Sequence, residues 1–314
     1  GICYLDGDYL CLCQSVYRYF LSLSGPTDST GKRGILMREK KIVKDYTKQK
    51  MLVFGVLAGM VILIALFAPY LTPYDPYEQD LGNALLPPGK EHLLGTDRYG
   101  RDMLSRVMVG AQSTIFSALL LVVVITVTGS MIGIICGYHG GKLDVFLMRL
   151  SDVFLAFPGM VFAIAVASVM SGGIFNAVVA LACISWPKYA RITRSQVMAI
   201  KNMPYIEAAK LSGSGTLKII RKHILPNIAG AIVVTAVLDI GTMIMEIAGL
   251  SFLGLGATPP TAEWGSMMSN GRSMLQTSPW VILAPGMAIF LTVMIFNLAG
   301  DTMRDILDPR QRKG

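Results

Sequence analysis

The chain has 314 residues, of which 53% are hydrophobic and only 15% are charged, and its mean hydropathy is +0.54. A soluble domain of this size needs a larger charged surface, so the composition indicates a membrane protein. The net charge of +8 is concentrated beside apolar segments and lacks interleaved aromatic residues, which argues against a nucleic-acid-binding protein.

Six apolar runs with few or no charges follow one another along the chain. They comprise residues 51–71, 111–137, 153–170, 174–186, 228–250 and 281–299. A transmembrane helix needs about 20 such residues, and most of these runs approach or exceed that length. Buried helices of a soluble protein are the weaker interpretation, since they are usually shorter and carry a polar face. The sequence therefore predicts an all-α, polytopic membrane protein with six transmembrane helices.

Lysine and arginine are unevenly distributed among the segments that flank these runs. Six basic residues lie in 37–50, and residues 187–227 hold eight basic residues against one acid, Glu207. The segments 72–110 and 251–280 show no such excess. Because cytoplasmic segments are enriched in Lys and Arg, we expect the first two inside and the last two outside. The six spans then alternate correctly, with both termini in the cytoplasm.

The composition also divides the chain into segments. Residues 1–36 hold cysteines and a stretch of small polar residues but no apolar span, and we expect an extension outside the working fold. Residues 37–50 form a basic cytoplasmic lead, 51–300 form the six-helix domain with its cytoplasmic loop at 187–227, and 301–314 form a cytoplasmic tail.

The sequence offers no pattern for catalysis. It has neither a G-x-x-x-x-G-K-[ST] phosphate loop nor a G-x-S-x-G nucleophile elbow. Its three histidines, His92, His139 and His223, are far apart and lack the spacing of a metal site. We therefore expect no catalytic residues, no firm metal ligands and no cofactor bound by this chain.

The most informative segment lies in the basic loop between the fourth and fifth runs. Its motif residues are Glu207, Ala208, Ala209, Gly213, Leu225 and Pro226. The motif resembles the coupling loop of permease subunits in ABC importers, except that His223 occupies a position often held by Ile. The resemblance implies that the loop contacts a separate ATPase chain and transmits its motion to the membrane helices. An amphipathic linker lying on lipid is the alternative.

The same loop has a structural interpretation of its own. Pro204 stands where a helix can begin, and good helix formers occupy 205–211. Gly213 breaks this helix, and we expect a second, basic helix over 217–224 that ends before Pro226. Two short helices joined by a glycine turn form a compact knob that can move as a rigid body with an ATPase.

Further motifs extend the resemblance over nearly all of 50–312. They are G-T-D-R-Y-G-R-D at 95–102, E-I-A-G-L-S-F-L-G at 246–254, P-P-T-A-E-W-G at 259–265 and N-L-A-G-D-T-M-R-D-I-L-D-P at 297–309. Together they resemble the C-type permease of dipeptide, oligopeptide and nickel importers. This resemblance implies the type I ABC importer permease fold and a location in the plasma membrane of a prokaryote. It also implies a homologous second permease, two ATPase subunits that bind ATP and Mg, and an extracytoplasmic substrate-binding protein.

The choice of cargo depends on the fifth run. Its L-D-I-G sequence at 238–241, with the A-E-W-G loop, resembles nickel permeases more than peptide permeases. Asp239 and Glu246 are seven residues apart, so they share nearly one helix face with Met243, and ionisable groups in a span usually face a pathway. We therefore expect Asp239, Met243 and Glu246 to line a pathway for nickel, either as the ion or as a chelate.

Other interpretations of this run remain open. Glu246 also belongs to the peptide-type motif, where it can pair with the partner permease, and methionine-rich faces are usually packing surfaces. Nickel permeases carry histidines near this point, where this chain has Thr242 and Glu246, which argues against a histidine-lined path. A dipeptide or oligopeptide importer is the alternative function, and a stand-alone channel or secondary transporter is a more distant one.

Overall fold

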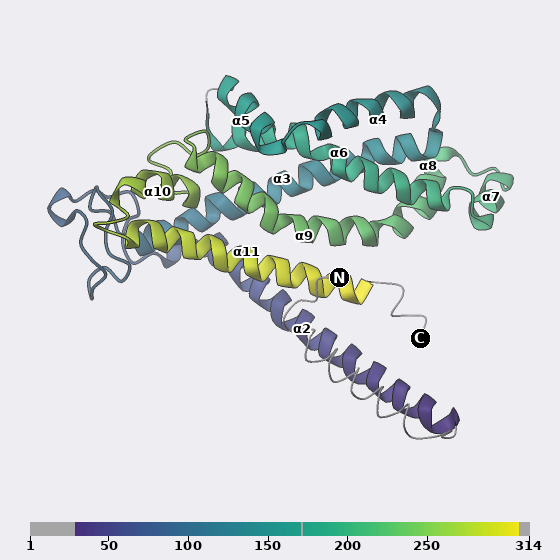
Figure 1. Ribbon diagram of the computed structural model, residues 1–314, viewed down its shortest axis with the longest axis horizontal. Coiled ribbons are helices and arrows are strands. Elements are labelled where there is room, and N and C mark those ends of the chain that lie inside the picture. Colours follow the sequence, from purple (N-terminus) through teal and green to yellow (C-terminus); the bar gives the residue numbers. More distant parts are fainter. Residues whose placement is uncertain (1–28, 171, 308–314) are drawn as a thin grey trace. The chain divides into compact units, whose positions relative to one another are not determined.

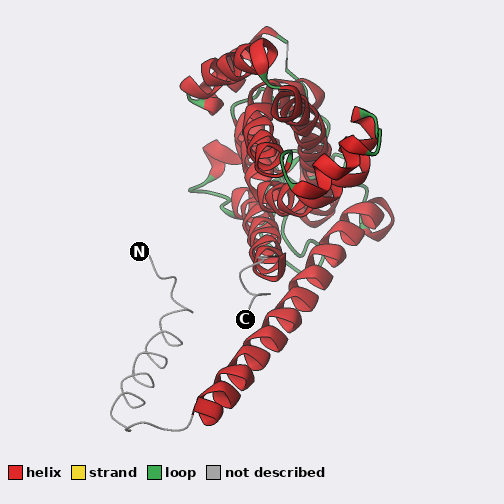
Figure 2. Ribbon diagram, turned by 90° about the vertical axis from the view of Figure 1, so that its right-hand side faces the viewer, coloured by secondary structure: helices red, strands yellow, loops and turns green. Residues whose placement is uncertain are grey.

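The computed structural model describes residues 29–170 and 172–307. Most of the extension expected at 1–36, and the end of the tail expected at 301–314, lie outside these ranges. The described residues form helices and connecting loops, with no strand among them (Figures 1 and 2). They divide into two compact units between Lys50 and Met51.

The described elements fall into a longer and a shorter group. The long ones are α2 (Ser29–Leu71), α3 (Met103–His139), α4 (Gly141–Ala156), α5 (Gly159–Val169), α6 (Ile174–Ile200), α9 (Leu225–Phe252) and α11 (Trp280–Leu307). The short ones are α7 (Pro204–Leu211), α8 (Thr216–Ile219), α10 (Trp264–Gly271), the 3-10 turns η1 (Leu81–Asn83) and η3 (Arg272–Met274), and the π-helical turn η2 (Ile220–Ile224). All elements from η1 onward belong to the unit that begins at Met51.

Four helical segments of the described chain are long and apolar enough to cross a membrane. They lie at Gln49–Leu71, Met103–His139, Thr216–Phe252 and Trp280–Ile306. The count rises to five if α4 and α5 form one bent span. The expected six spans are therefore not fully confirmed. The remaining helix, α6, is 27 residues long, but its second half carries Lys188, Arg191 and Arg194, which make it less apolar than the others.

The run at 153–170, expected as the third span, is interrupted by a sharp bend. Helix α4 ends at Ala156, α5 begins at Gly159, and the two helices are bent by 93°. Phe157 between them has extended backbone, with φ −92° and ψ 145°. Pro158 explains the break, because proline has no N–H for a helical bond and disfavours helical backbone in the residue before it.

Helices α3 and α6 pack closely along three glycines of α3. Gly129, Gly133 and Gly137 are four residues apart, so they form one face of the helix. A Cβ atom added at Gly133 would lie 2.5 Å from the carbonyl oxygen of Ala190 and 2.7 Å from the Cβ of Thr193. Small residues at these positions therefore let the two backbones approach, as is common between membrane helices.

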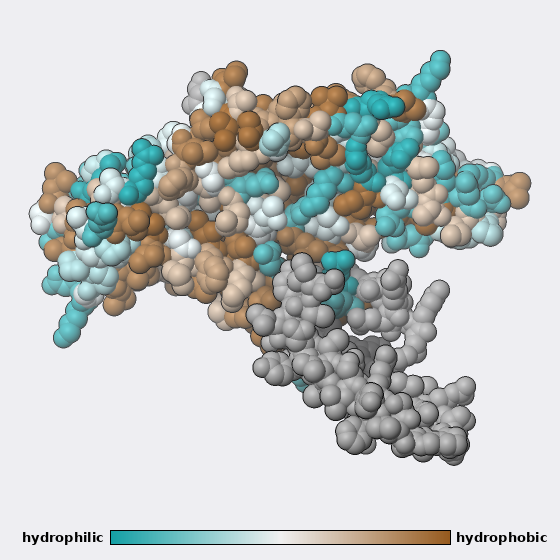
Figure 3. All heavy atoms as spheres, viewed as in Figure 1, coloured by the Kyte–Doolittle hydropathy of each residue, from teal (hydrophilic) through white to brown (hydrophobic). Residues whose placement is uncertain are grey.

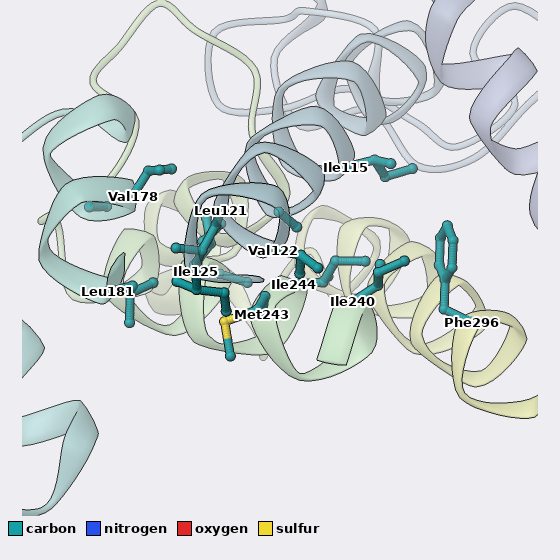
Figure 4. Packing of buried hydrophobic residues seen from close by; sticks show 14 of the residues in the cluster. Ile115, Leu121, Val122, Ile125, Val178, Leu181, Ile240, Met243, Ile244 and Phe296 are labelled. Atoms are coloured by element: carbon teal, nitrogen blue, oxygen red, sulfur yellow. The ribbon is translucent and has the colours of Figure 1, made fainter. Parts of the chain in front are cut away.

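A hydrophobic core joins α3, α6, α9 and α11 (Figure 4). Its buried side chains include Ile115, Leu121, Ile125, Leu181, Ile244 and Phe296. The face seen in Figure 3 is apolar over much of its middle, and hydrophilic residues gather toward its two ends. This distribution suits a protein whose middle contacts lipid.

The loop between α2 and α3 and the short helix α7 lie at opposite ends of the helices (Figure 1). The loop shares its end with α10 and the start of α11, where Arg98 donates a hydrogen bond to Asn270 and the indole of Trp280 donates to the carbonyl of Thr96. The separation places 72–102 and α7 on opposite sides of a membrane that the helices cross. Which side is cytoplasmic stays a prediction.

Candidate functional site

The motif of the basic loop folds into a compact knob, formed by α7, α8 and the turn between them. Pro204 occupies the first turn of α7, where its missing N–H removes no helical hydrogen bond. After α7, Gly213 has a φ of +77°, and the N–H of Ser214 donates to the carbonyl of Ala209 at 3.1 Å. The helix expected over 205–211 and the break at Gly213 are therefore confirmed.

The knob buries some of its motif residues and presents others. Ala209 is buried with Ile206, and these two side chains belong to the hydrophobic core. Glu207 and Ala208 are exposed, and Leu211 is 90% exposed. The backbone N–H of Glu207 donates to the carbonyl of Met203 at 3.2 Å, but its carboxylate makes no hydrogen bond or ion pair with any described residue. The exposed side of the knob thus presents a carboxylate and a leucine.

The second expected helix does not end before Pro226, so that expectation was wrong. Helix α8 passes through the π-helical turn η2 into α9, and residues 216–252 form one continuous helical segment. In η2 the N–H of Leu225 donates to the carbonyl of Ile220, five residues earlier. Leu225 and Pro226 instead occupy exposed positions inside this helical segment, directly after η2, and Pro226 has no N–H with which to make a helical hydrogen bond.

Asp239, expected in the translocation pathway, is buried between α9 and α6. One carboxylate oxygen accepts a hydrogen bond from the ammonium of Lys188 at 2.6 Å. The other accepts from the hydroxyl of Tyr189 at 2.9 Å. Asp239 is 4% exposed, whereas the Lys188 side chain is 50% exposed. The negative charge of Asp239 is therefore neutralised by a neighbouring cation that itself reaches the surface.

The other two pathway candidates differ from Asp239 and from each other. Met243 is 5% exposed and packs in the hydrophobic core beside Ile244 (Figure 4). Its thioether is therefore not on an open face of α9. The Glu246 side chain is partly exposed and makes no hydrogen bond or ion pair with a described residue, although the charges of Asp239 and Lys188 act on it. The structure thus brings Asp239 together with Lys188 but leaves Glu246 as the carboxylate available to a ligand or partner.

Sequence reasoning missed a second set of charges, which joins α4 to α6. Arg194 binds Asp144 through two hydrogen bonds of 2.5 and 2.7 Å. Arg191 pairs with Asp152, two turns further along α4. The available signal was the eight-residue spacing of the two acids, which matches one face of a helix. These ion pairs hold the first half of the bent α4–α5 pair against α6.

The G-T-D-R-Y-G-R-D motif at 95–102 has a structural role in the loop before α3. The carboxylate of Asp97 pairs with Arg101 at 2.7 Å, and Asp102 caps α3 by accepting from a backbone N–H at 2.7 Å. Gly100 has a φ of +74°, and a Cβ there would collide with the backbone of Asp80. The motif therefore builds a rigid loop from charge pairs and tight backbone contacts.

Glu263, from the A-E-W-G motif, caps α10 in a fully buried position. It accepts hydrogen bonds from the N–H groups of Gly265 and Ser266 at 2.9 and 2.8 Å, and from the hydroxyl of Thr114 on α3 at 3.3 Å. Burial raises the pKa of the Glu263 carboxyl above its ordinary value. This residue ties α10 to α3, so its place in the motif has a structural explanation.

The described residues provide no evident metal centre. Across 29–170 and 172–307, no group of three or more His, Cys, Asp or Glu side chains is arranged to hold a metal ion. His92 instead bonds Asp102 through Nδ1 at 3.0 Å.

Comparisons with known families place this arrangement in context. Residues 129–313 match the family described as "Binding-protein-dependent transport system inner membrane component". Residues 41–88 match the "N-terminal TM domain of oligopeptide transport permease C". The two matches together cover the first membrane helix and most of the helices from α3 to α11.

Individual relatives extend over most of the chain. The dipeptide transport system permease protein DppC of Haemophilus influenzae is 39% identical over 270 residues, which cover 82% of this chain and 92% of that protein. The nickel transport system permease protein NikC of Escherichia coli K12 is 39% identical over 254 residues, covering 81% and 92%. The glutathione transport system permease protein GsiD of Pectobacterium atrosepticum is 42% identical over 259 residues, covering 82% and 85%.

A solved structure shares the fold. The inward-facing MetNI methionine ABC transporter matches with a TM-score of 0.54 and 19% identity, covering 65% of this chain and 97% of the matched one. At this identity the match concerns the fold, which is that of a type I ABC importer permease. With its family matches and its all-helical, membrane-spanning unit, the chain belongs to the binding-protein-dependent inner membrane transport components and is a C-type, non-catalytic permease subunit of an ABC importer.

Proposed function

We propose that this permease imports dipeptides or oligopeptides and forms half of their translocation pathway. The observation that carries the proposal is the 2.6 Å pairing of Asp239 with Lys188. A partly dehydrated divalent cation needs uncompensated negative charge, and this pair does not supply it. A peptide at neutral pH carries both an ammonium and a carboxylate, so it suits a surface that presents both signs of charge.

Similarity to known proteins supports the same cargo. The relatives include dipeptide permeases and a glutathione permease as well as a nickel permease, and the match to an oligopeptide permease domain covers 41–88. The expectation of nickel from the L-D-I-G sequence at 238–241 therefore gives way to its alternative. The expectation of nickel was weak because sequence spacing identifies Asp239 as an acid within a span but does not show that the ammonium of Lys188 neutralises it.

The proposal includes the partners of this subunit. A homologous second permease completes the pathway, and an extracytoplasmic binding protein delivers the peptide. Two ATPase subunits bind ATP and Mg and dock on the knob formed by α7 and α8, where Glu207 and Leu211 are exposed. The knob and both termini are cytoplasmic, in keeping with the excess of Lys and Arg in 187–227.

Uptake by the reconstituted complex tests the cargo directly. The permease would be purified with its sister permease and ATPase, placed in proteoliposomes, and supplied with its binding protein and ATP. We expect ATP-dependent uptake of radiolabelled alanyl-alanine, while radioactive nickel does not accumulate. Nickel uptake without dipeptide uptake would overturn the proposal.

Nickel is the second candidate cargo because the Glu246 carboxylate makes no hydrogen bond or ion pair with a described residue. An unpaired carboxylate at membrane depth can lower the energy of a cation there. If nickel is the cargo, Glu246→Gln should depress its uptake, whereas the neutral pair Lys188→Gln/Asp239→Asn should leave it nearly unchanged.

A further inference from the structure

Polar groups line one face of α9 at membrane depth. Thr235, Thr242 and Glu246 stand at positions i, i+7 and i+11, which share one side of a helix. All three are partly or fully exposed, although the unit has a largely apolar middle. On α6, Lys188 is likewise half exposed, and its ammonium lies against Asp239 of α9.

The height of Lys188 in the membrane makes its exposure informative. Lys188 is 14 residues from the start of α6 at Ile174, and Asp239 is 14 residues from the start of α9 at Leu225. At about 1.5 Å per residue Asp239 lies roughly 21 Å along α9, within the span Thr216–Phe252. Lys188 stands just past the apolar part of α6, but its ammonium lies 2.6 Å from this carboxylate. Charged groups at this depth face a bundle interior or a water-filled cavity, because contact with lipid is unfavourable.

The ammonium of Lys188 is fixed in position but keeps hydrogen-bonding capacity. A lysine ammonium has three N–H donors, and one of them is directed at Asp239. Tyr189 holds the far oxygen of the same carboxylate, so the carboxylate cannot readily turn away. The two remaining donors are available at the exposed side of Lys188.

We propose that Lys188 binds the C-terminal carboxylate of a peptide in transit, and that Glu246 receives its N-terminal ammonium. The inference rests on the proposed function, since it requires a peptide cargo. Asp239 and Tyr189 act as positioning residues that hold Lys188, and they do not contact the peptide. The site is a transient one, because a charge-assisted hydrogen bond at each end holds a peptide without enclosing it.

The spacing of the two groups suits a short peptide. Asp239, which holds the lysine, and Glu246 are seven residues apart, or about 10.5 Å along the axis of α9. An extended dipeptide spans about 7 Å, and a hydrogen bond of about 2.8 Å at each end brings the total to roughly 12.6 Å. A single amino acid of about 3.5 Å gives roughly 9.1 Å by the same sum, so the spacing accommodates both free amino acids and dipeptides.

A neutral double variant separates binding from folding. Lys188→Gln alone leaves Asp239 buried without its cation, and such a variant can fail to fold. Lys188→Gln/Asp239→Asn removes both charges and keeps a hydrogen-bonding pair of similar shape. In proteoliposomes containing the whole complex, alanyl-alanine uptake per ATP hydrolysed should fall about tenfold in the double variant, the effect of losing one charge-assisted hydrogen bond. Assembly and stimulated ATP hydrolysis should persist.

Three further variants complete the experiment. Lys188→Arg should retain most of the wild-type uptake, because it keeps the positive charge. Lys142→Gln, which removes an exposed lysine of α4, is the control and should behave as wild type. Glu246→Gln should lower uptake per ATP as well. If Glu246→Gln instead reduces only assembly with the sister permease, the ammonium assignment is overturned.

The outcomes distinguish this inference from the proposed function. Normal uptake per ATP in Lys188→Gln/Asp239→Asn, with wild-type uptake present, overturns the Lys188 site and leaves peptide import standing. Equal losses of assembly, ATP hydrolysis and uptake show a structural role for the pair and also overturn the site. Absence of alanyl-alanine uptake in the wild type overturns the proposed function, and the inference fails with it.

Discussion

Arg194 on α6 donates two hydrogen bonds to Asp144 on α4, at 2.5 and 2.7 Å. The planar guanidinium matches the two carboxylate oxygens, which a lysine ammonium does not do. Because α4 leads directly into the bend at Pro158, this pair fixes one arm of the bent helix pair against α6.

Removing this contact should loosen α4. Arg194→Ala is expected to lower the stability of the purified permease by about 2 kcal/mol, since it leaves a largely buried carboxylate without its partner. Thermal unfolding in detergent, followed by tryptophan fluorescence, measures the change. Arg149→Ala, at an exposed arginine of α4, is the control and should have little effect. Equal effects of the two variants would contradict the assigned role of Arg194.

The glycine contact between α3 and α6 gives a second test. Gly133→Ala is expected to destabilise the permease by about 1–3 kcal/mol, because the new methyl group would overlap the backbone of Ala190 and force the helices apart. Gly59→Ala, on α2, meets no atom within 4 Å and should not destabilise the permease, because alanine is the better helix former. If Gly133→Ala were as stable as Gly59→Ala in the same unfolding assay, the close approach of α3 and α6 would be disproved.

The turn in the knob allows a substitution series at one position. Gly213 has a φ of +77°, which proline cannot adopt because its ring fixes φ near about −65°. We expect Gly213→Pro to uncouple ATP hydrolysis from uptake while the membrane helices stay folded. Gly213→Asn should remain active, since asparagine tolerates positive φ. The readouts are uptake and ATP hydrolysis by the reconstituted complex. Normal uptake in Gly213→Pro would show that the knob does not transmit motion.

The cap at Glu263 predicts a dependence of stability on pH. Its pKa is raised in the folded protein, so between the unfolded pKa of about 4.3 and the folded pKa the folded state binds more protons. The stability contributed by this group is present below about pH 4.3 and is lost as the pH rises through the folded pKa. The stability of wild type relative to Glu263→Gln should therefore decrease with increasing pH, as measured by unfolding across pH 4–8. An increase would mean that the cap favours the charged carboxylate.

Accessibility labelling tests the orientation of the chain. In a background without the native cysteines, Leu81→Cys should react with an impermeant reagent on intact cells, and Leu211→Cys should react only after the cells are opened. Both positions are well exposed, with 71% and 90% of the leucine accessible, so a cysteine that fails to react lies on the side of the membrane that the reagent cannot reach. If only Leu211→Cys were labelled in intact cells, the topology would be the opposite of the one proposed.

Local features of the fold were predictable from the sequence because they depend on neighbouring residues. The helix over 205–211 follows from Pro204 and the helix formers after it, and Gly213 ends it because a positive φ suits glycine. The apolar runs located the long helices for the same reason. Pro158 could have predicted the bend in 153–170. The bend was missed because an uncharged apolar run resembles one continuous transmembrane helix.

Contacts between distant residues were not predictable in this way. Lys188 and Asp239 are 51 residues apart, and nothing in either helix alone indicates that they meet. The acid therefore suggested a path for a cation, whereas its actual environment is an ion pair. The helix that was expected to end at 224 continues into α9 through the π-helical turn that precedes Pro226. A sequence pattern with a period of 3.6 residues predicts regular α-helix and does not indicate such a turn.

The 93° bend between α4 and α5 has a consequence for how the protein enters the membrane during synthesis. Helix α5 has 11 residues, and the apolar part of the following helix ends after about 13, whereas a segment needs about 20 apolar residues to partition into the bilayer as an independent helix. Neither segment meets that requirement when it first emerges from the ribosome. Stable insertion of α5 must therefore wait until α6 has been made and has docked on the glycine face of α3, so this part of the chain is integrated as a pair of helices.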